Sequence, residues 1–172
     1  MHTAPTPDNR KIEPMELTLN LRDLQPDDLG DLERSGGPEH IVALAGAIQA
    51  SFAGEVALVV VELANGRLVA SGAADFRRAP DVGRLEMLSV HETFQDLGVG
   101  TWMIRALEER VRTTGRSKAQ LSVEHDNPRA GALYRRLGYR EVGSALESWS
   151  SASGTFVTVT TMLQRDLEGP SH

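Results

Sequence analysis

The feature that most constrains the fold is a glycine-containing turn, Gln95-Asp96-Leu97-Gly98-Val99-Gly100, placed between a strand-like and a helix-like segment. Residues 84–90 before the turn have the composition of a strand, and residues 99–114 after it carry apolar side chains at helical spacing. A helix that begins at such a turn leaves its first backbone N–H groups without acceptors, at the positive end of the helix dipole. The turn therefore predicts a site for an anion such as a phosphate or pyrophosphate.

The rest of the chain predicts a mixed α/β sheet. Strands are expected near residues 17–21, 56–63, 67–76, 84–90, 119–124, 139–149 and 155–163, and helices at 27–34, 38–52, 99–114 and 128–137. Asn65-Gly66 predicts a hairpin turn between the second and third strands. The strand–helix–strand passage over residues 84–124 predicts a parallel pair, because strands joined by a crossover helix run in the same direction.

Composition fits one domain and excludes several classes of function. The chain has 172 residues, and we expect a single domain at residues 15–165 between a disordered N-terminal tail at 1–14 and a C-terminal tail at 166–172. The formal net charge of −6 argues against a nucleic-acid partner. The absence of cysteine excludes disulfides, thiolate zinc sites and a cysteine nucleophile. The five histidines show no metal-binding spacing, so no metal is expected.

Segments that target or anchor proteins are also missing from the sequence. No apolar run approaches the roughly 20 residues of a membrane span, and residues 1–14 lack the apolar centre of a secretory signal. The G-x-S-x-G motif of serine hydrolases does not occur. We therefore expect a protein of the cytoplasm with no membrane partner.

Three phosphate-binding motifs can be compared with the turn. A dinucleotide fingerprint requires G-x-G-x-x-G, but Met103 stands at the third glycine position and a predicted hairpin precedes the turn. A P-loop requires Gly-Lys-Ser/Thr, but Thr101 follows Gly100 directly. A pyrophosphate turn of the pattern Q/R-x-x-G-x-G/A fits at every fixed position.

The turn and a second motif together resemble the GNAT acetyltransferase superfamily. Leu88-Ser89-Val90-His91 and the turn are similar to its motif A, and Asn127-Pro128-Arg129-Ala130, followed by Leu133-Tyr134 and Leu137-Gly138-Tyr139, is similar to its motif B. The resemblance covers residues 15–163 and implies a mixed, mostly antiparallel sheet of six to seven strands, about four flanking helices and a central parallel pair. It also implies an N-acetyltransferase that uses acetyl-CoA.

The resemblance assigns most of the site to coenzyme A. It implies cofactor contacts for Leu88, Ser89, Val90, Gln95, Asp96, Leu97, Gly98, Val99, Gly100, Thr101, Asn127, Ala130 and Tyr134. The turn lacks the arginines that many family members carry there, so we expect the pyrophosphate to depend on backbone N–H groups and the helix dipole. Asp96 is expected to point to solvent. Arg129 either supplies charge from the next helix or is a solvated surface arginine.

The resemblance also assigns the chemical steps. Tyr134 is expected to protonate the leaving thiolate as general acid, although its spacing with Ala130 and Leu137 equally fits a core aromatic residue. A backbone N–H in residues 88–90 would stabilise the oxyanion. The base that deprotonates the amine is left open between Glu86, the first candidate, and Glu124 with its neighbour His125. Direct attack by the amine is favoured, because no cysteine is available for an acyl-enzyme.

The acceptor is left open as a primary amine of a small molecule or a peptide. In the family, the segments that correspond to residues 36–54 and 146–155 shape its site. Phe52, Phe76 and Trp149 are candidate walls, and Glu147 would attract a cation; Phe52 also fits the core and Trp149 a dimer interface. Homodimers are common in the family, so a second copy of the chain is a candidate partner. The alternative function is a non-catalytic acyl-CoA-binding or regulatory protein of the same fold.

Overall fold

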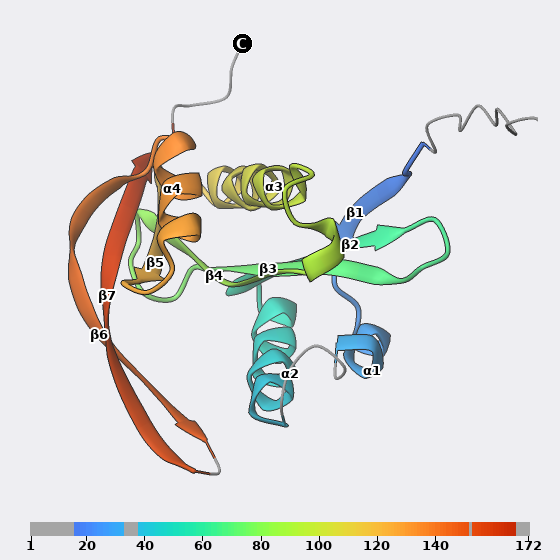
Figure 1. Ribbon diagram of the computed structural model, residues 1–172, viewed down its shortest axis with the longest axis horizontal. Coiled ribbons are helices and arrows are strands. Elements are labelled where there is room, and N and C mark those ends of the chain that lie inside the picture. The colour runs from blue at the N-terminus through green and yellow to red at the C-terminus, as the bar shows by residue number, and fades with distance from the viewer. Residues whose placement is uncertain (1–15, 33–37, 152, 168–172) are drawn as a thin grey trace, which may run out of the picture.

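A single mixed sheet forms the centre of the protein. The computed structural model describes residues 16–32, 38–151 and 153–167, so the tail expected at 1–14 lies outside the described residues (Figure 1). Within these ranges, seven strands pair in the order β1-β2-β3-β4-β5-β7-β6. They are β1 (Leu19–Asp23), β2 (Val56–Leu63), β3 (Leu68–Asp75), β4 (Val82–Val90), β5 (Lys118–Glu124), β6 (Arg140–Ser151) and β7 (Gly154–Asp166). Only β4 and β5 are parallel among these pairs, which confirms the predicted fold class.

Four α-helices among the described residues cover the two faces of the sheet. They are α1 (Leu29–Leu32), α2 (Pro38–Phe52), α3 (Val99–Thr113) and α4 (Pro128–Arg136), with 3-10 turns η1 (Pro26–Asp28) and η3 (Glu92–Phe94). Figure 1 shows α1 and α2 on one face and α3 and α4 on the other. None of the helices in the described part of the chain is long and apolar enough to span a membrane.

Two apolar clusters fill the spaces between helices and sheet. The larger cluster packs α3 and the end of α4 against the sheet, and it includes Leu85, Met103, Leu107 and Leu163. The smaller cluster packs α1 and α2 against the other face, and it includes Leu44, Ile48 and Val60. Leu85 and Met87 of β4 are two residues apart and would share a face in a regular strand. Leu85 nevertheless faces α3, whereas Met87 packs on the α2 side, so the alternation of β4 is interrupted between them.

Several predicted boundaries differ from the structure by a few residues, and two of these differences have a clear physical cause. The helix expected at 27–34 begins instead as a 3-10 turn, because the Asp28 carboxylate accepts from the backbone N–H of Gln25 (2.7 Å) and from the Arg22 guanidinium (2.8 Å). Its last two residues, 33 and 34, lie outside the described residues. At the other end, β7 continues to Asp166 and Leu167 is buried, whereas the last strand was expected to end at residue 163. The backbone N–H of Leu167 donates to Ser117 O (2.7 Å), which holds this end of the chain beside β5.

β4 and β5 are paired over only part of their length. The parallel register joins Val82 to Lys118, Gly83 to Ala119 and Arg84 to Gln120, and the described pairing stops there. On its other edge, β4 carries a β-bulge, because Met87 and Leu88 both lie opposite Gly72 of β3. Met87 has a φ of 56°, the left-handed conformation that a bulge can impose on one residue. The second half of β4 thus remains paired with β3 but has parted from β5.

A buried carboxylate joins α3 to the strands beyond the parting. Glu108 of α3 has no exposed surface, yet it accepts hydrogen bonds from the Tyr139 hydroxyl (2.9 Å), Arg105 (2.9 Å) and Arg165 (2.6 Å). Burial raises the pKa of Tyr139, and the neighbouring Glu108 carboxylate raises it further, so the hydroxyl remains a donor. The network ties α3 to β7 and to the segment that follows α4.

Replacing this carboxylate should destabilise the protein. The change Glu108→Gln removes the negative charge that faces two arginines inside the fold, and loss of one partner of a buried ion pair costs about 3 kcal/mol. Urea denaturation should show this decrease in the free energy of unfolding. The matched control is Glu109→Gln, which removes an exposed carboxylate paired with Arg112 (3.1 Å) and should leave stability close to wild type. Equal effects of the two changes would contradict a structural role for the network.

Candidate functional site

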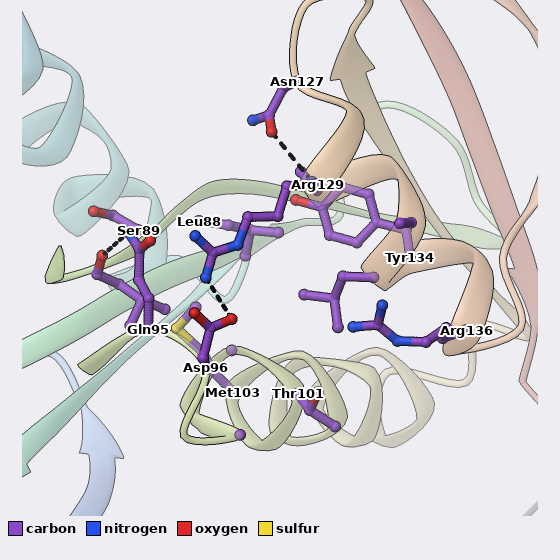
Figure 2. Close-up of a pocket in the computed structure, with 16 residues that line it drawn as sticks. Leu88, Ser89, Gln95, Asp96, Thr101, Met103, Asn127, Arg129, Tyr134 and Arg136 are labelled. Atoms are coloured by element: carbon purple, nitrogen blue, oxygen red, sulfur yellow. Dashed lines mark hydrogen bonds and ion pairs between the residues drawn. The ribbon is translucent and has the colours of Figure 1, made fainter. Parts of the chain in front are cut away.

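A cavity of about 490 Å³ occupies the gap on the α3–α4 side of the parted strands. Its size lies in the range of small-molecule binding sites. β4 forms one wall, the turn before α3 a second, and α4 the third (Figure 2). The residues that line it are Leu88, Ser89, Val90, Gln95, Asp96, Gly98, Gly100, Thr101, Met103, Asn127, Arg129, Ala130, Ala132, Leu133, Tyr134 and Arg136. Eleven of the thirteen residues predicted to contact the cofactor are therefore brought together in one place.

The glycine turn opens α3 without a side-chain cap. Gly98 is the N-cap residue, with a φ of 81° that favours glycine, and no side chain caps the helix there. The first intrahelical hydrogen bond runs from Trp102 N to Gly98 O (3.0 Å), so the N–H groups of residues 99–101 have no acceptor within the helix. Because Gly98, Gly100 and Thr101 line the cavity, this end of α3 offers backbone donors and the positive end of its dipole to an anion.

Two predicted contact residues do not line the cavity. Leu97 is 61% exposed, and the side chain of Val99 is 2% exposed within the larger apolar cluster. Successive helical residues turn by about 100°, so Val99 faces the sheet when Gly100 and Thr101 face the cavity. Gln95 does line the cavity, but its side-chain amide donates to Val90 O (3.1 Å) and so ties the turn to the end of β4.

β4 presents backbone groups to the gap. His91 N donates to Val69 O in β3 (2.7 Å), and successive N–H groups along a strand point to opposite sides. The N–H of Val90 therefore points away from β3, to the side from which β5 has parted. Such groups need a partner in water or in a ligand, because buried backbone donors are rarely left unpaired. An extended ligand with amide groups would find its hydrogen-bonding partners along this edge.

An ion pair crosses the cavity between the turn and α4. Asp96 Oδ1 lies 2.5 Å from Arg129 Nη2, although the two side chains remain 81% and 61% exposed (Figure 2). Asp96, which was expected to point to solvent, is largely exposed but is directed across the cavity to Arg129. Arg136, about two turns further along α4 on the same side of the helix, adds a second positive charge to the lining.

α4 positions Asn127 and Tyr134. The Asn127 side chain accepts from the backbone N–H of Ala130 (3.1 Å), which confirms the predicted N-cap and fixes the start of the helix at Pro128. Tyr134 extends from α4 into the cavity (Figure 2). Its ring centre lies 6.4 Å from that of Tyr139. Burial raises the pKa of Tyr134 above its usual value near 10, so its hydroxyl stays protonated around neutral pH.

The carboxylates predicted as bases lie outside the cavity lining. Glu86 projects from β4 on the α2 side, one residue before the bulge, at 3.8 Å from Arg84 and 3.7 Å from Arg78. Burial raises the pKa of Glu86, nearby Asp75 adds to the rise, and the two arginines partly offset it. Glu124, at the end of β5, is exposed. It is two residues from Ser122, whose hydroxyl accepts from Arg84 (3.1 Å), so it belongs to the same face of the sheet as Glu86.

The residues expected to surround the acceptor are only partly placed there. Phe76 is buried, with the Arg116 guanidinium 5.0 Å from its ring centre, so it is not a wall of an open site. Phe52 is 77% exposed, which contradicts its assignment to the core; it lines a second cavity beside β1 and β2, away from β4. Glu147 pairs with Arg84 and so lies beside Glu86 and Ser122. The Trp149 side chain lies outside the described residues.

Sequence reasoning missed several residues of the lining. Met103 projects from the second turn of α3, whereas Ala132, Leu133 and Arg136 come from α4. Helical spacing could have grouped the missed residues of α4, because residues 129, 132 or 133, and 136 lie on one face of a helix. What it could not reveal is which face of α4 turns toward the cavity.

Comparison with known proteins identifies the fold. The family model described as the acetyltransferase (GNAT) family matches residues 21–139. An acetyltransferase of the GNAT family from Streptococcus pneumoniae is similar in structure, with a TM-score of 0.64, 18% identity, and coverage of 87% of this chain and 100% of that chain. For the ribosomal-protein-S18-alanine N-acetyltransferase of Escherichia coli, the TM-score is 0.65 and the identity 17%, with coverage of 90% of this chain and 97% of that chain. For the spermidine/spermine N-acetyltransferase of Vibrio cholerae, the TM-score is 0.67 and the identity 20%, with coverage of 86% of this chain and 92% of that chain.

The left-handed conformation of Gly98 at the start of α3 can be tested by measuring the stability of a variant protein. A side chain at Gly98 would be held at a φ of 81°, which costs about 1–2 kcal/mol for an L-residue. We expect Gly98→Ala to lower the free energy of unfolding by this amount in urea denaturation. Gly46→Ala, in the middle of α2 where an added Cβ meets nothing within 4 Å, should instead raise it. A Gly98→Ala protein as stable as the wild type would contradict the geometry assigned to the turn.

Proposed function

Because the chain belongs to the acetyltransferase (GNAT) family, we propose that it transfers the acetyl group of acetyl-CoA to a primary amine of a small molecule or peptide. The cavity at the parted strands carries this proposal. It combines an uncapped helix N-terminus, a free strand edge and a partly buried tyrosine, which are the three kinds of group that binding a pyrophosphate, an amide-containing arm and a leaving thiolate require.

Successive parts of the lining would bind successive parts of coenzyme A, from the pyrophosphate to the acyl group. The N–H groups of residues 99–101 would bind the pyrophosphate. Residues 88–90 of β4 would pair with the two amides of the pantetheine arm, as an added strand pairs with a sheet edge. Asn127 and Ala130 at the start of α4 would contact the cofactor on the opposite wall. The acyl group would then reach the part of the cavity that Tyr134 and the bulge enclose.

In this proposal the acetyl group passes directly from acetyl-CoA to the amine while both are bound to the protein. The acceptor nitrogen attacks the thioester carbonyl, and the oxyanion that forms accepts a hydrogen bond from a backbone N–H in residues 88–90. The C–N bond is formed and the C–S bond is broken. The proton of Tyr134 passes to the thiolate, and the proton of the amine passes to a base. A tyrosine with a raised pKa suits this part, because it is still protonated when the thiolate leaves.

Glu86 is the base that the surroundings favour. Its partly buried carboxylate has a raised pKa, and a carboxylate with a raised pKa is a better proton acceptor than an exposed one. It also lies next to the bulge, which connects it through the backbone to the strand edge that would hold the thioester. Glu124, exposed at the end of β5, is the second candidate.

A cationic acceptor suits the charges on this side of the sheet. Glu86 and Glu147 both approach Arg84, and an ammonium group can share their carboxylates. By their names, the Escherichia coli relative acts on an alanine of a ribosomal protein and the Vibrio cholerae relative on spermidine and spermine. An amine acceptor is the feature that we carry over from these names.

A homodimer is also part of the proposal. Leu146 of β6 lies opposite Val159 of β7, and with Val157 they form an exposed apolar stripe on the long β6–β7 hairpin. Exposed apolar stripes of this kind are typical of protein interfaces. A second copy of the chain is the partner expected there.

The catalytic function can be separated from simple acyl-CoA binding. Release of free thiol from acetyl-CoA should depend on the presence of a polyamine, an amino acid amide or a peptide N-terminus. Tight binding of acetyl-CoA without thiol release on any acceptor would favour the non-catalytic alternative. Absence of acetyl-CoA binding would contradict both functions.

Removal of the Tyr134 hydroxyl should slow turnover without weakening the cofactor complex. We expect Tyr134→Phe to reduce kcat by about ten-fold or more, because the thiolate would leave without a proton donor. The Kd for acetyl-CoA, measured by calorimetry, should stay within about two-fold of wild type, since the ring and its contacts are kept. A variant with the kcat of the wild type would exclude Tyr134 as the general acid.

The base should set the acidic side of the pH profile. A base acts only when deprotonated, so kcat/KM should fall as the pH drops through the raised pKa of Glu86. In Glu86→Gln this limb should disappear and the plateau should fall, whereas Glu124→Gln should keep the limb. Because the raised pKa shows that the charged form is disfavoured by folding, Glu86→Gln should be no less stable than wild type at pH 8. An unchanged profile in Glu86→Gln would assign the base to Glu124 or to water.

A further inference from the structure

The ion pair between Asp96 and Arg129 lies where an anionic ligand would need positive charge. Both residues line the cavity, one from the turn before α3 and the other from the first turn of α4 (Figure 2). Asp96 Oδ1 and Arg129 Nη2 are 2.5 Å apart. The carboxylate therefore already takes up the guanidinium that is best placed to meet a phosphate of the ligand.

Asp96 has no other task among the described contacts. It does not cap α3, because Gly98 is the N-cap residue and no side chain caps that helix. Its own backbone has a φ of 64°, which Asp tolerates better than most residues, but Gly and Asn tolerate it as well without adding a negative charge. Arg129 is the one partner that the Asp96 carboxylate has in the described part of the chain. The arrangement places a negative charge beside the helix N-terminus, where an anionic ligand is to bind.

The pair is weak enough to exchange partners. The two side chains are 81% and 61% exposed, and exposed ion pairs gain little over their hydrated state. A phosphate carries more negative charge than a carboxylate, and the planar guanidinium can bind two of its oxygens at once. A phosphate brought into the cavity by the rest of the ligand should therefore displace the carboxylate from Arg129.

We propose that Asp96 lowers the affinity of the site by competing with the phosphates of coenzyme A for Arg129. The inference rests on the proposed use of acetyl-CoA. In the free protein Arg129 is bound by Asp96; in the complex it binds a phosphate oxygen, and Asp96 turns to solvent. Because Asp96 touches neither the thioester nor the acceptor site, it weakens acetyl-CoA and coenzyme A alike. Its effect is to ease release of the spent cofactor after transfer.

The test is a double-mutant cycle on coenzyme A binding. Asp96→Asn removes the charge and keeps a residue that tolerates a positive φ. At low ionic strength its Kd for coenzyme A should be about three- to ten-fold below that of the wild type. Arg129→Gln should raise the Kd by a similar factor. In the Arg129→Gln background, Asp96→Asn should change the Kd by less than about two-fold, because the contested partner is gone.

Two controls separate this competition from general charge effects. Glu109→Gln also removes an exposed, arginine-paired carboxylate on α3, but outside the cavity, and should leave the Kd unchanged. Pantetheine, which has no phosphate, should bind the wild type and Asp96→Asn equally. Raising the salt concentration should weaken coenzyme A binding more steeply in Asp96→Asn than in the wild type, because screening then acts on an uncompensated attraction.

The outcomes distinguish this inference from the function on which it rests. If the wild type binds coenzyme A but Asp96→Asn has an unchanged or higher Kd, the proposed competition is wrong. The acetyltransferase proposal then remains intact. An equal gain in affinity in both backgrounds would also overturn it, since direct repulsion would then be the cause. Failure of every protein in the cycle to bind coenzyme A would overturn both.

Discussion

β4 and β5 stay hydrogen-bonded for three residue pairs and then part, and the site depends on that separation. Sheet backbone is normally satisfied on both edges, so a strand that loses one neighbour within the fold leaves donors and acceptors for another partner. The bulge at Met87 and Leu88 keeps β4 paired with β3 while it changes direction. Gly72 makes this possible, because an added Cβ there would lie 3.0 Å from Leu88 and 3.1 Å from Leu107.

The helices hold the separation open and give the two sides of the sheet different chemistry. On one side, α3 and α4 place an uncapped helix N-terminus, two arginines and a tyrosine around the cavity. On the other side, Glu86 and Glu147 share Arg84. The two sides of the same strands therefore carry different charged groups, with arginines lining the cavity and carboxylates around Arg84. The buried Glu108 network links α3 to β7 and to the segment that follows α4.

Local patterns predicted the elements more reliably than their ends. The alternation of Leu19 and Leu21, the Asn65-Gly66 turn and the Asn127 cap are encoded within a few residues, and the structure confirms the strand, the hairpin and the helix start. Phe52 was harder to place, because its spacing fits the buried face of α2 while its position at the helix end leaves it exposed. The extension of β7 to Asp166 depends on its pairing with Lys118 of β5, a segment distant in the chain, and no local pattern reports it.

The sequence by itself determined the glycine turn that opens α3 and the helix face that carries Tyr134, because glycine at a left-handed position, a helix start and a helix face are all short-range properties. It also indicated the parallel pair, since neighbouring strands joined by a single crossover helix usually run in the same direction. Tertiary structure alone decided that β5 leaves β4 at Arg84, that Val99 turns inward while Gly100 faces the cavity, and that Asp96 meets Arg129. Each of these depends on segments that are distant in the chain and meet only when the sheet has closed and the helices have packed on it.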